Sequence, residues 1–210
     1  QKALNLGNVE LMDLNSFPGR EENRYILDVE NPEIIFTQGY SATNVFYKNI
    51  SYFTICSFSC SEELISLYNS FDDQVIKDLR LNAFFEDNGD EQYRVSKVGE
   101  KVYDCFAIRS VELYLNKAEA EAMLDKAEAI QTIKTLLHNR FEGGIPDVDG
   151  LSGKDLVSFI RDERRRELCF EAHRWFDLRR YAVSPKYPEK KSIRHTTYDK
   201  NGVLEGDYVL

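Results

Sequence analysis

Few of the side chains that usually perform catalysis are spaced for it in this 210-residue sequence. The histidines His138, His173 and His195 lie too far apart along the chain to indicate a shared metal site. The acidic sets at 86–87 and 147–149 do not match a calcium loop. No G-x-S-x-G, GxxxxGK(S/T), HExxH or GxGxxG motif is present, and no spacing marks a glycosidase carboxylate pair. We therefore expect neither enzymatic activity nor a metal or cofactor.

His173, inside the charged segment 161–180, is expected to be a hydrogen-bonded or surface residue and not a general base. The cysteines do not form a metal-binding pattern, and we expect isolated thiols. In an oxidising compartment Cys56 and Cys60 can pair, but spacing alone leaves the pairing open. The cysteines are Cys56, Cys60, Cys105 and Cys169.

Residues 38–58 alternate aromatic rings with amides and hydroxyls, a composition suited to sugars. A sugar ring has an apolar C–H face that stacks on an aromatic ring and a rim of hydroxyls that needs short polar partners. The predicted platform is Tyr40, Tyr47 and Tyr52, and the predicted polar rim is Gln38, Asn44 and Asn49. The alternative is that the same aromatic residues only pack this segment on the core.

Residues 161–180 have the composition of one long helix with dense opposite charge. The spacing predicts a narrow apolar stripe with Trp175 buried as an anchor. The stripe consists of Leu168, Ala172, Trp175 and Leu178. The expected ion pairs, each contributing roughly 0.2–0.5 kcal/mol, are Asp162 with Arg166, Glu163 with Arg166, and Glu171 with Arg174. The arginines are expected to be solvated or to reach helix ends and acidic neighbours.

The elements before this segment change type near residue 59. Residues 1–58 read as strands and loops, with the best strand at 33–37. From Ser59, which has capping-box spacing to Glu62, a short helix follows. Its expected apolar face is Leu64, Leu67 and Tyr68. The polar connection at 82–104 contains Asn88–Gly89 as a hairpin turn between the apolar pairs 84–85 and 93–95.

Helix is expected again from about Cys105, followed by a second helix over 127–140. These two segments predict an antiparallel hairpin that resembles a tetratricopeptide pair. The apolar faces are Val111, Tyr114, Leu115, Ala118 and Ala122 in the first segment, and Ile130, Ile133 and Leu137 in the second. Gly143-Gly144 is expected to end the second helix, and Ser152 or Asp155 to begin the charged one. An irregular tail that wraps over the helices is expected from 182 to 210.

Four segments resemble the SusD/RagB family of outer-membrane lipoproteins and occur in the family's order. The strongest is 161–180, which is similar to the family's C-terminal signature, followed by Asn31-Pro-Glu-Ile-Ile-Phe36, by 61–68 with Asp78-Leu-Arg80, and by 108–120. The signature positions are Arg166, Glu167, Glu171, Arg174, Trp175, Asp177 and Arg179. The resemblance implies a mainly α SusD-like fold with a tetratricopeptide-like hairpin, long loops and a few short strands. It also implies that 1–210 is the C-terminal half of a longer protein, with 1–58 as a strand and loop region and 59–181 as the helical body.

The function implied by this resemblance is non-catalytic binding of oligosaccharides or polysaccharides at the bacterial cell surface. The glycan would pass to a SusC-like TonB-dependent transporter during polysaccharide utilization. The protein would be held at the outer membrane by a lipid anchor on the absent N-terminal part. The alternative is a helical protein-interaction scaffold without glycan binding. A net charge of −9 argues against nucleic acid as a partner, and no stretch approaches the length of a membrane span.

Overall fold

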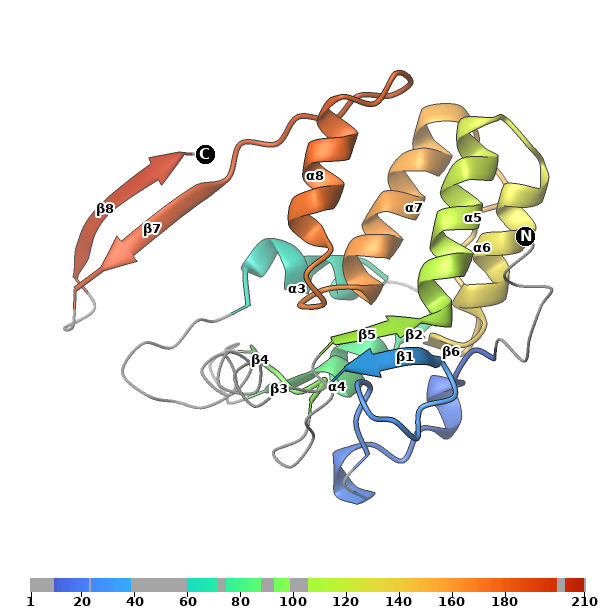
Figure 1. Ribbon diagram of the computed structural model, residues 1–210, viewed down its shortest axis with the longest axis horizontal. Helices are drawn as coiled ribbons and strands as arrows, with labels where there is room; N and C mark the ends of the chain where they lie inside the picture. Colours follow the sequence, from blue (N-terminus) through green and yellow to red (C-terminus); the bar gives the residue numbers. More distant parts are fainter. Residues whose placement is uncertain are drawn as a thin grey trace.

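The structure, a computed structural model, describes residues 10–22, 24–38, 60–71, 75–87, 93–98, 106–199 and 203–209. Helices predominate, and in these residues the short strands pair only in twos (Figure 1). The helical elements are η1 (Leu14–Ser16), η2 (Arg20–Glu22), α3 (Glu62–Asn69), α4 (Arg80–Phe84), α5 (Ser110–Met123), α6 (Glu128–Leu137), α7 (Gly153–Glu167) and α8 (Arg174–Ala182). The strands are β1 (Ile34–Gln38), β2 (Lys77–Asp78), β3 (Phe85–Asp87), β4 (Tyr93–Val95), β5 (Phe106–Arg109), β6 (Phe141–Glu142), β7 (Arg194–Tyr198) and β8 (Leu204–Val209). The expected mainly α fold is confirmed.

The helices α5, α6 and α7 stand side by side and enclose the larger apolar core (Figure 1). On α5 the buried residues Val111, Leu115 and Ala118 recur at helical spacing, and they meet Ile133 of α6 and Ile160 of α7 in one cluster. The predicted α5–α6 hairpin is therefore confirmed. None of the helices in the described ranges combines the length and apolar character needed to cross a bilayer.

The start of α5 differs from the prediction, because the four residues before it form a strand. β5 pairs antiparallel with β1, and Phe36 lies opposite Ile108. The strand expected at 33–37 is confirmed as β1. The Ser110 amide donates to the Glu33 carbonyl at 2.7 Å. This hydrogen bond ties the first residue of α5 to the β1 side of the sheet, so the helix begins where the sheet ends.

A second apolar cluster lies under α3, α4 and the β3–β4 hairpin. Ser61 caps α3 by accepting a hydrogen bond from the Leu64 amide at 3.3 Å, so the cap is two residues later than the predicted Ser59. In the hairpin Phe85 lies opposite Val95, so the predicted pairing of the two stretches is confirmed, although Phe84 belongs to α4. The expected turn at Asn88–Gly89 lies outside the described residues.

The charged segment 161–180 is two helices and not one, which corrects the prediction. α7 ends at Glu167 and α8 begins at Arg174, and between them Phe170 and Ala172 adopt φ of 60° and 64°. Left-handed backbone is costly for residues with a Cβ, so tertiary contacts must hold the turn. The break removes the predicted apolar stripe, and Trp175 is 56% exposed instead of buried.

The end of α6 also differs from the prediction. α6 stops at Leu137, and β6 pairs with β2 before Gly143 is reached. Gly143 has φ of +79°, and a Cβ placed there would lie 2.4 Å from the Val75 carbonyl oxygen. This glycine therefore permits close backbone approach after the strand and does not cap the helix.

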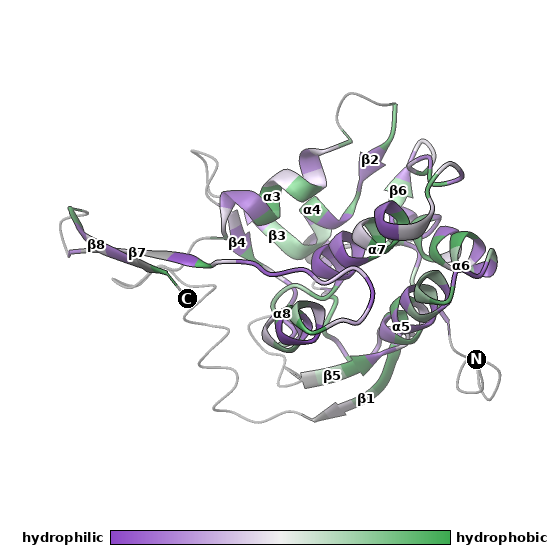
Figure 2. Ribbon diagram, turned by 90° about the horizontal axis from the view of Figure 1, so that it is seen from above, coloured by the Kyte–Doolittle hydropathy of each residue, from purple (hydrophilic) through white to green (hydrophobic). Residues whose placement is uncertain are grey.

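The tail begins as predicted and ends differently. Residues 183–191 lie over the helices, where the Arg161 guanidinium donates to the Tyr187 carbonyl at 2.8 Å and the Lys191 amine to Glu63 of α3 at 2.8 Å. The following residues form the β7–β8 hairpin, where irregular chain was expected. Figures 1 and 2 both show this hairpin projecting away from the helical body.

Candidate functional site

Most of the predicted sugar-binding residues, namely Tyr40, Asn44, Tyr47, Asn49 and Tyr52, lie outside the described residues. The exception is Gln38, whose backbone ends β1 opposite Phe106 of β5.

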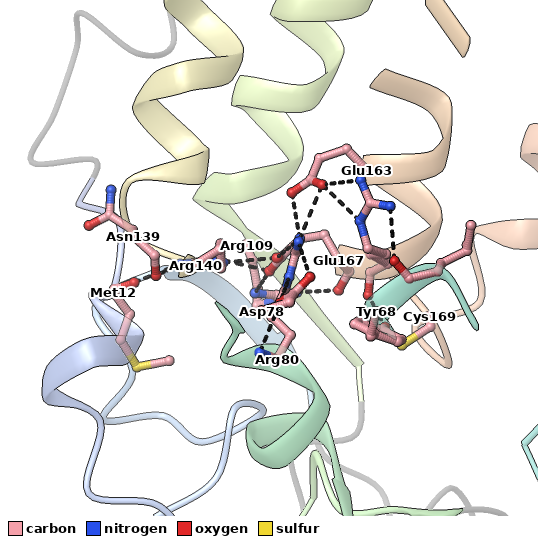
Figure 3. A network of polar contacts seen from close by, with 12 residues as sticks. Met12, Tyr68, Asp78, Arg80, Arg109, Asn139, Arg140, Glu163, Glu167 and Cys169 are labelled. Atoms are coloured by element: carbon pink, nitrogen blue, oxygen red, sulfur yellow. Dashed lines mark hydrogen bonds and ion pairs between the residues drawn. The ribbon is translucent and has the colours of Figure 1, made fainter. Parts of the chain in front are cut away.

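Three of the signature residues, Arg166, Glu167 and Glu171, form a buried ionic network with their partners at the C-terminal end of α7 (Figure 3). Each of these side chains is at most 4% exposed. The cations are Arg80, Lys97, Arg109, Arg140 and Arg166, and the anions are Glu33, Asp78, Glu163, Glu167 and Glu171. Five formal charges of each sign balance, which is the condition under which buried ions are tolerated.

Glu167 lies at the centre of the ionic network. Its carboxylate accepts hydrogen bonds from Arg140 Nε at 2.9 Å, Arg109 Nη1 at 3.0 Å and Arg80 Nη1 at 3.3 Å. Burial alone would raise the pKa of Glu167, but the three guanidinium groups hold that pKa well below its ordinary value. Glu167 thus joins the ends of α4, α5 and α6 to α7.

The Asp-x-Arg element enters the network through Arg80 at the start of α4. Its guanidinium donates to Asp78 Oδ2 at 2.7 Å and to Glu163 Oε1 at 2.5 Å. Arg166 donates to Glu163 Oε2 at 2.7 Å, so the predicted Glu163–Arg166 pair is confirmed. The predicted Asp162–Arg166 pair does not form, because Arg166 is directed to Glu163.

The left-handed turn after α7 is fixed by Lys97 and Arg109. Lys97 Nζ donates to the carbonyl oxygens of Glu167 and Cys169 at 2.8 and 3.1 Å, and to Glu171 Oε1 at 2.5 Å. Arg109 donates to both Glu171 oxygens at 2.6 and 2.9 Å. The predicted Glu171–Arg174 pair does not form, because the Glu171 carboxylate points into the network and accepts from Lys97 and Arg109 instead.

A second ionic group attaches α8 to α5 and α7. Asp177 accepts from Arg164 Nε at 2.8 Å and from Arg180 Nε at 2.9 Å, and Arg180 also donates to Glu119 of α5 at 2.6 Å. His173 Nδ1 lies 3.5 Å from Arg164 Nη2, in keeping with a hydrogen-bonded histidine. The other two signature arginines lie nearer the solvent: Arg174 is half-buried and Arg179 is exposed.

The two cysteines in the described ranges, Cys60 and Cys169, are free thiols. Burial raises the pKa of Cys60 to about 12, and burial also raises the pKa of Cys169. A thiol with a raised pKa is a poor nucleophile, so these residues serve packing. Cys56 and Cys105 lie outside the described residues, so pairing of Cys56 stays a prediction that the free Cys60 does not support.

A surface pocket of about 260 Å³ lies between residues 12–18 and the loop 22–32 that precedes β1; we refer to it as the N-terminal pocket. Its lining combines the half-buried rings of Phe17 and Tyr25 with polar groups. The charged residues that line it are Asp13, Glu22, Arg24, Asp28 and Glu30. Aromatic surface beside convergent polar groups is typical of small-molecule sites.

The buried ionic network holds the inner wall of the N-terminal pocket. The Met12 amide donates to Glu33 Oε1 at 3.0 Å, and the Met12 carbonyl accepts from Arg140 Nη1 at 2.6 Å. Asn31, which is buried, donates to the Ile26 carbonyl at 2.7 Å and accepts from the Glu33 amide at 2.9 Å. The pocket is therefore braced by the same groups that join the helices.

The architecture is a helical hairpin and a third helix joined at one end by a neutral network of buried ions, and the described residues include no group of histidine, cysteine or acidic side chains placed to hold a metal ion. The sequence model of the SusD family matches residues 79–205, more than half of the chain. The chain belongs to the SusD family.

Two relatives give the extent of the similarity. The chain is 40% identical to SusD-like protein P38 of Formosa agariphila over 77 residues, which are 33% of this chain and 15% of that protein. It superposes with a TM-score of 0.62 and 21% identity on the SusD-like carbohydrate binding protein of Bacteroides vulgatus ATCC 8482. That superposition covers 100% of this chain and 45% of the other, so the chain spans less than half the length of these relatives.

Proposed function

We propose that this protein binds oligosaccharides or polysaccharides without covalent chemistry at the surface of the bacterial outer membrane. The observation that carries the proposal is membership of the SusD family, together with a fold shared over the whole chain with a protein described as carbohydrate binding. The proposal also holds that the chain is the C-terminal half of a longer, lipid-anchored protein, and that the bound glycan passes to a SusC-like TonB-dependent transporter.

The state of the buried carboxylates supports a binding role over an enzymatic one. Glu163, Glu167 and Glu171 each accept hydrogen bonds from at least two cations, and their pKa values are lowered because these cations outweigh the effect of burial. A general acid in a glycosidase needs a raised pKa and access to the substrate. These glutamates have neither, so their role is structural.

The glycan contacts are proposed to lie in the segment after β1, with Tyr40, Tyr47 and Tyr52 as the stacking platform. Gln38, Asn44 and Asn49 would then hydrogen-bond to the sugar hydroxyls. Isothermal titration calorimetry of the chain against soluble plant, host and microbial oligosaccharides is the direct test. Replacing the three tyrosines with alanine should weaken binding at least tenfold, since each ring contributes about 0.5–1.5 kcal/mol beyond its buried area.

The matched control replaces the same three tyrosines with phenylalanine, which keeps the rings and removes only the hydroxyls. Affinity within a few-fold of the parent chain is expected for this control. If the alanine variant binds as tightly as the parent, the segment is not the platform, although the protein can still be a glycan-binding protein. Delivery is tested separately, by co-purifying the full-length protein with its transporter in detergent and measuring glycan uptake.

Exposed apolar residues favour the second candidate, a protein-interaction scaffold. Phe36 and Ile108 lie opposite each other on β1 and β5 and are 55% and 48% exposed, and Phe176 of α8 is 67% exposed. Large apolar side chains that gather at the surface often mark protein contacts. The scaffold alone would show no affinity across the glycan panel, whereas the first proposal requires at least one ligand.

A further inference from the structure

We propose that the N-terminal pocket holds one ring of an uncharged or amino-substituted saccharide and rejects uronic-acid and sulfated sugars. This inference rests on the proposed glycan binding and names the class of sugar and a contact surface separate from the segment after β1. The pocket is formed by residues 12–18 and 22–32, all but residue 23 within the described part of the chain.

The size and lining of the N-terminal pocket fit a single sugar ring. A volume of about 260 Å³ lies just below the usual range for small-molecule pockets, roughly 300–1,000 Å³, so the pocket has room for one ring and not for a longer ligand. Tyr25 and Phe17 are both half-buried, so each ring keeps part of its surface free for the apolar face of a sugar. Among the described residues, the hydroxyl of Tyr25 has no hydrogen-bond partner, which leaves it for a ligand hydroxyl.

The charge of the N-terminal pocket decides the class of sugar. Four carboxylates and one guanidinium line it, and Arg24 is already paired with Glu30. Asp13 Oδ1 accepts from the Asn15 amide at 2.9 Å, and Asp28 Oδ1 accepts from the Glu30 amide at 3.0 Å. The second oxygens of both carboxylates have no partner among the described residues. They can accept sugar hydroxyls or an ammonium group, whereas a uronate or sulfate would meet like charge.

The bracing described above reduces the cost of binding. Met12 and Asn31 are held by Glu33 and Arg140 of the buried ionic network, and the Arg24 amide donates to the Gly19 carbonyl at 3.0 Å. A wall that is ordered before the ligand arrives loses less conformational freedom on binding.

The test is calorimetry of the whole 210-residue chain with three trisaccharides of equal length, built from neutral hexose, from glucosamine and from uronic acid, with EDTA present. The neutral or the glucosamine compound is expected to bind at least tenfold more tightly than the uronic acid at low salt. Added salt should reduce that difference, because it screens the carboxylates. Tyr25→Ala should weaken binding at least tenfold, and Tyr25→Phe by only a few-fold. The charge variant Asp28→Asn, combined with Glu22→Gln, should raise the affinity for the uronic acid.

Each outcome separates this inference from the proposed function. If the chain binds glycans and the Tyr25 and Asp28 variants leave every affinity unchanged, the pocket is not a sugar site, but the proposed function stands. Equal affinity for neutral and uronic compounds at low salt also overturns the pocket inference. Binding that appears only when calcium replaces EDTA would assign the carboxylates to a cation and overturn it as well. Absence of binding by every compound and across the wider glycan panel contradicts the proposed function itself.

Discussion

Replacing Glu167 with glutamine removes one negative charge from the centre of the buried ionic network. Five cations then face four anions, and the three arginines that donate to Glu167 lose an ionic acceptor at 2.9–3.3 Å. Glutamine has nearly the same volume, but its amide group is a donor and directs hydrogen toward the guanidinium groups. The perturbation is therefore electrostatic, with little change in packing.

Breaking a buried ion pair by removing one partner costs about 3–5 kcal/mol. We expect a loss in this range for Glu167→Gln, since the side chain is fully buried. The free energy of unfolding is to be measured by urea denaturation followed by circular dichroism. With an m-value of roughly 2 kcal/mol/M, the midpoint should fall by roughly 1.5–2.5 M. Against a typical stability of 5–15 kcal/mol, this loss is large.

The matched control is Asp162→Asn on the same helix. Asp162 is half-buried, and burial raises its pKa despite the nearby Arg166, so neutralising it should leave the midpoint nearly unchanged. The double variant Glu167→Gln with Arg140→Gln restores equal numbers of buried charges. It should lose less free energy than the sum of the two single changes. Equal midpoints for Glu167→Gln and Asp162→Asn would refute the view that the network is a balanced ionic core.

Further expectations concern pH, the lone tryptophan and a glycine. The folded-state pKa of Glu167 lies below its unfolded value near 4.3, so the unfolded chain binds more protons in acid. The stabilisation by ionised Glu167 is therefore present above about pH 4.3 and is lost as the pH falls through the folded-state pKa. Urea midpoints measured as a function of pH will test this. Trp175→Ala should lower the free energy of unfolding by less than about 1 kcal/mol because the ring is exposed, whereas Leu168→Ala, at a buried position, should lower it by about 2–5 kcal/mol. Similar losses for the two variants would contradict the exposure of Trp175, which acrylamide quenching of its fluorescence measures directly. Gly143→Ala should destabilise the fold by about 1–3 kcal/mol or more, through left-handed backbone strain and a clash with the Val75 carbonyl, and so lower the melting temperature. Gly150→Ala, where a Cβ meets no atom within 4 Å, should lower the melting temperature little.

Local patterns were sufficient to predict the elements whose contacts are near in sequence. The α5–α6 hairpin follows from apolar residues at helical spacing on two adjacent segments, and the β3–β4 hairpin from two apolar stretches around a turn. The break in the segment 161–180 could not be predicted in this way. Phe170 and Ala172 have no special preference for positive φ, and the turn is held by Lys97 and Arg109, which lie more than 50 residues earlier.

The burial of the signature residues Glu167 and Glu171 follows from the same distant contacts. Helix-pair rules assign Glu171 to Arg174, but Arg109 offers two hydrogen bonds in a dry environment and therefore prevails. One signal was present in the sequence, since 161–180 contains arginine and no lysine. Arginine is the cation that proteins favour for buried, multiply hydrogen-bonded ion pairs, because its planar group keeps its charge and is weakly hydrated. A segment of acids and arginines without lysine therefore indicates an ionic core. Its buried glutamates need cations from elsewhere in the chain, and here Arg80 and Arg140 supply them.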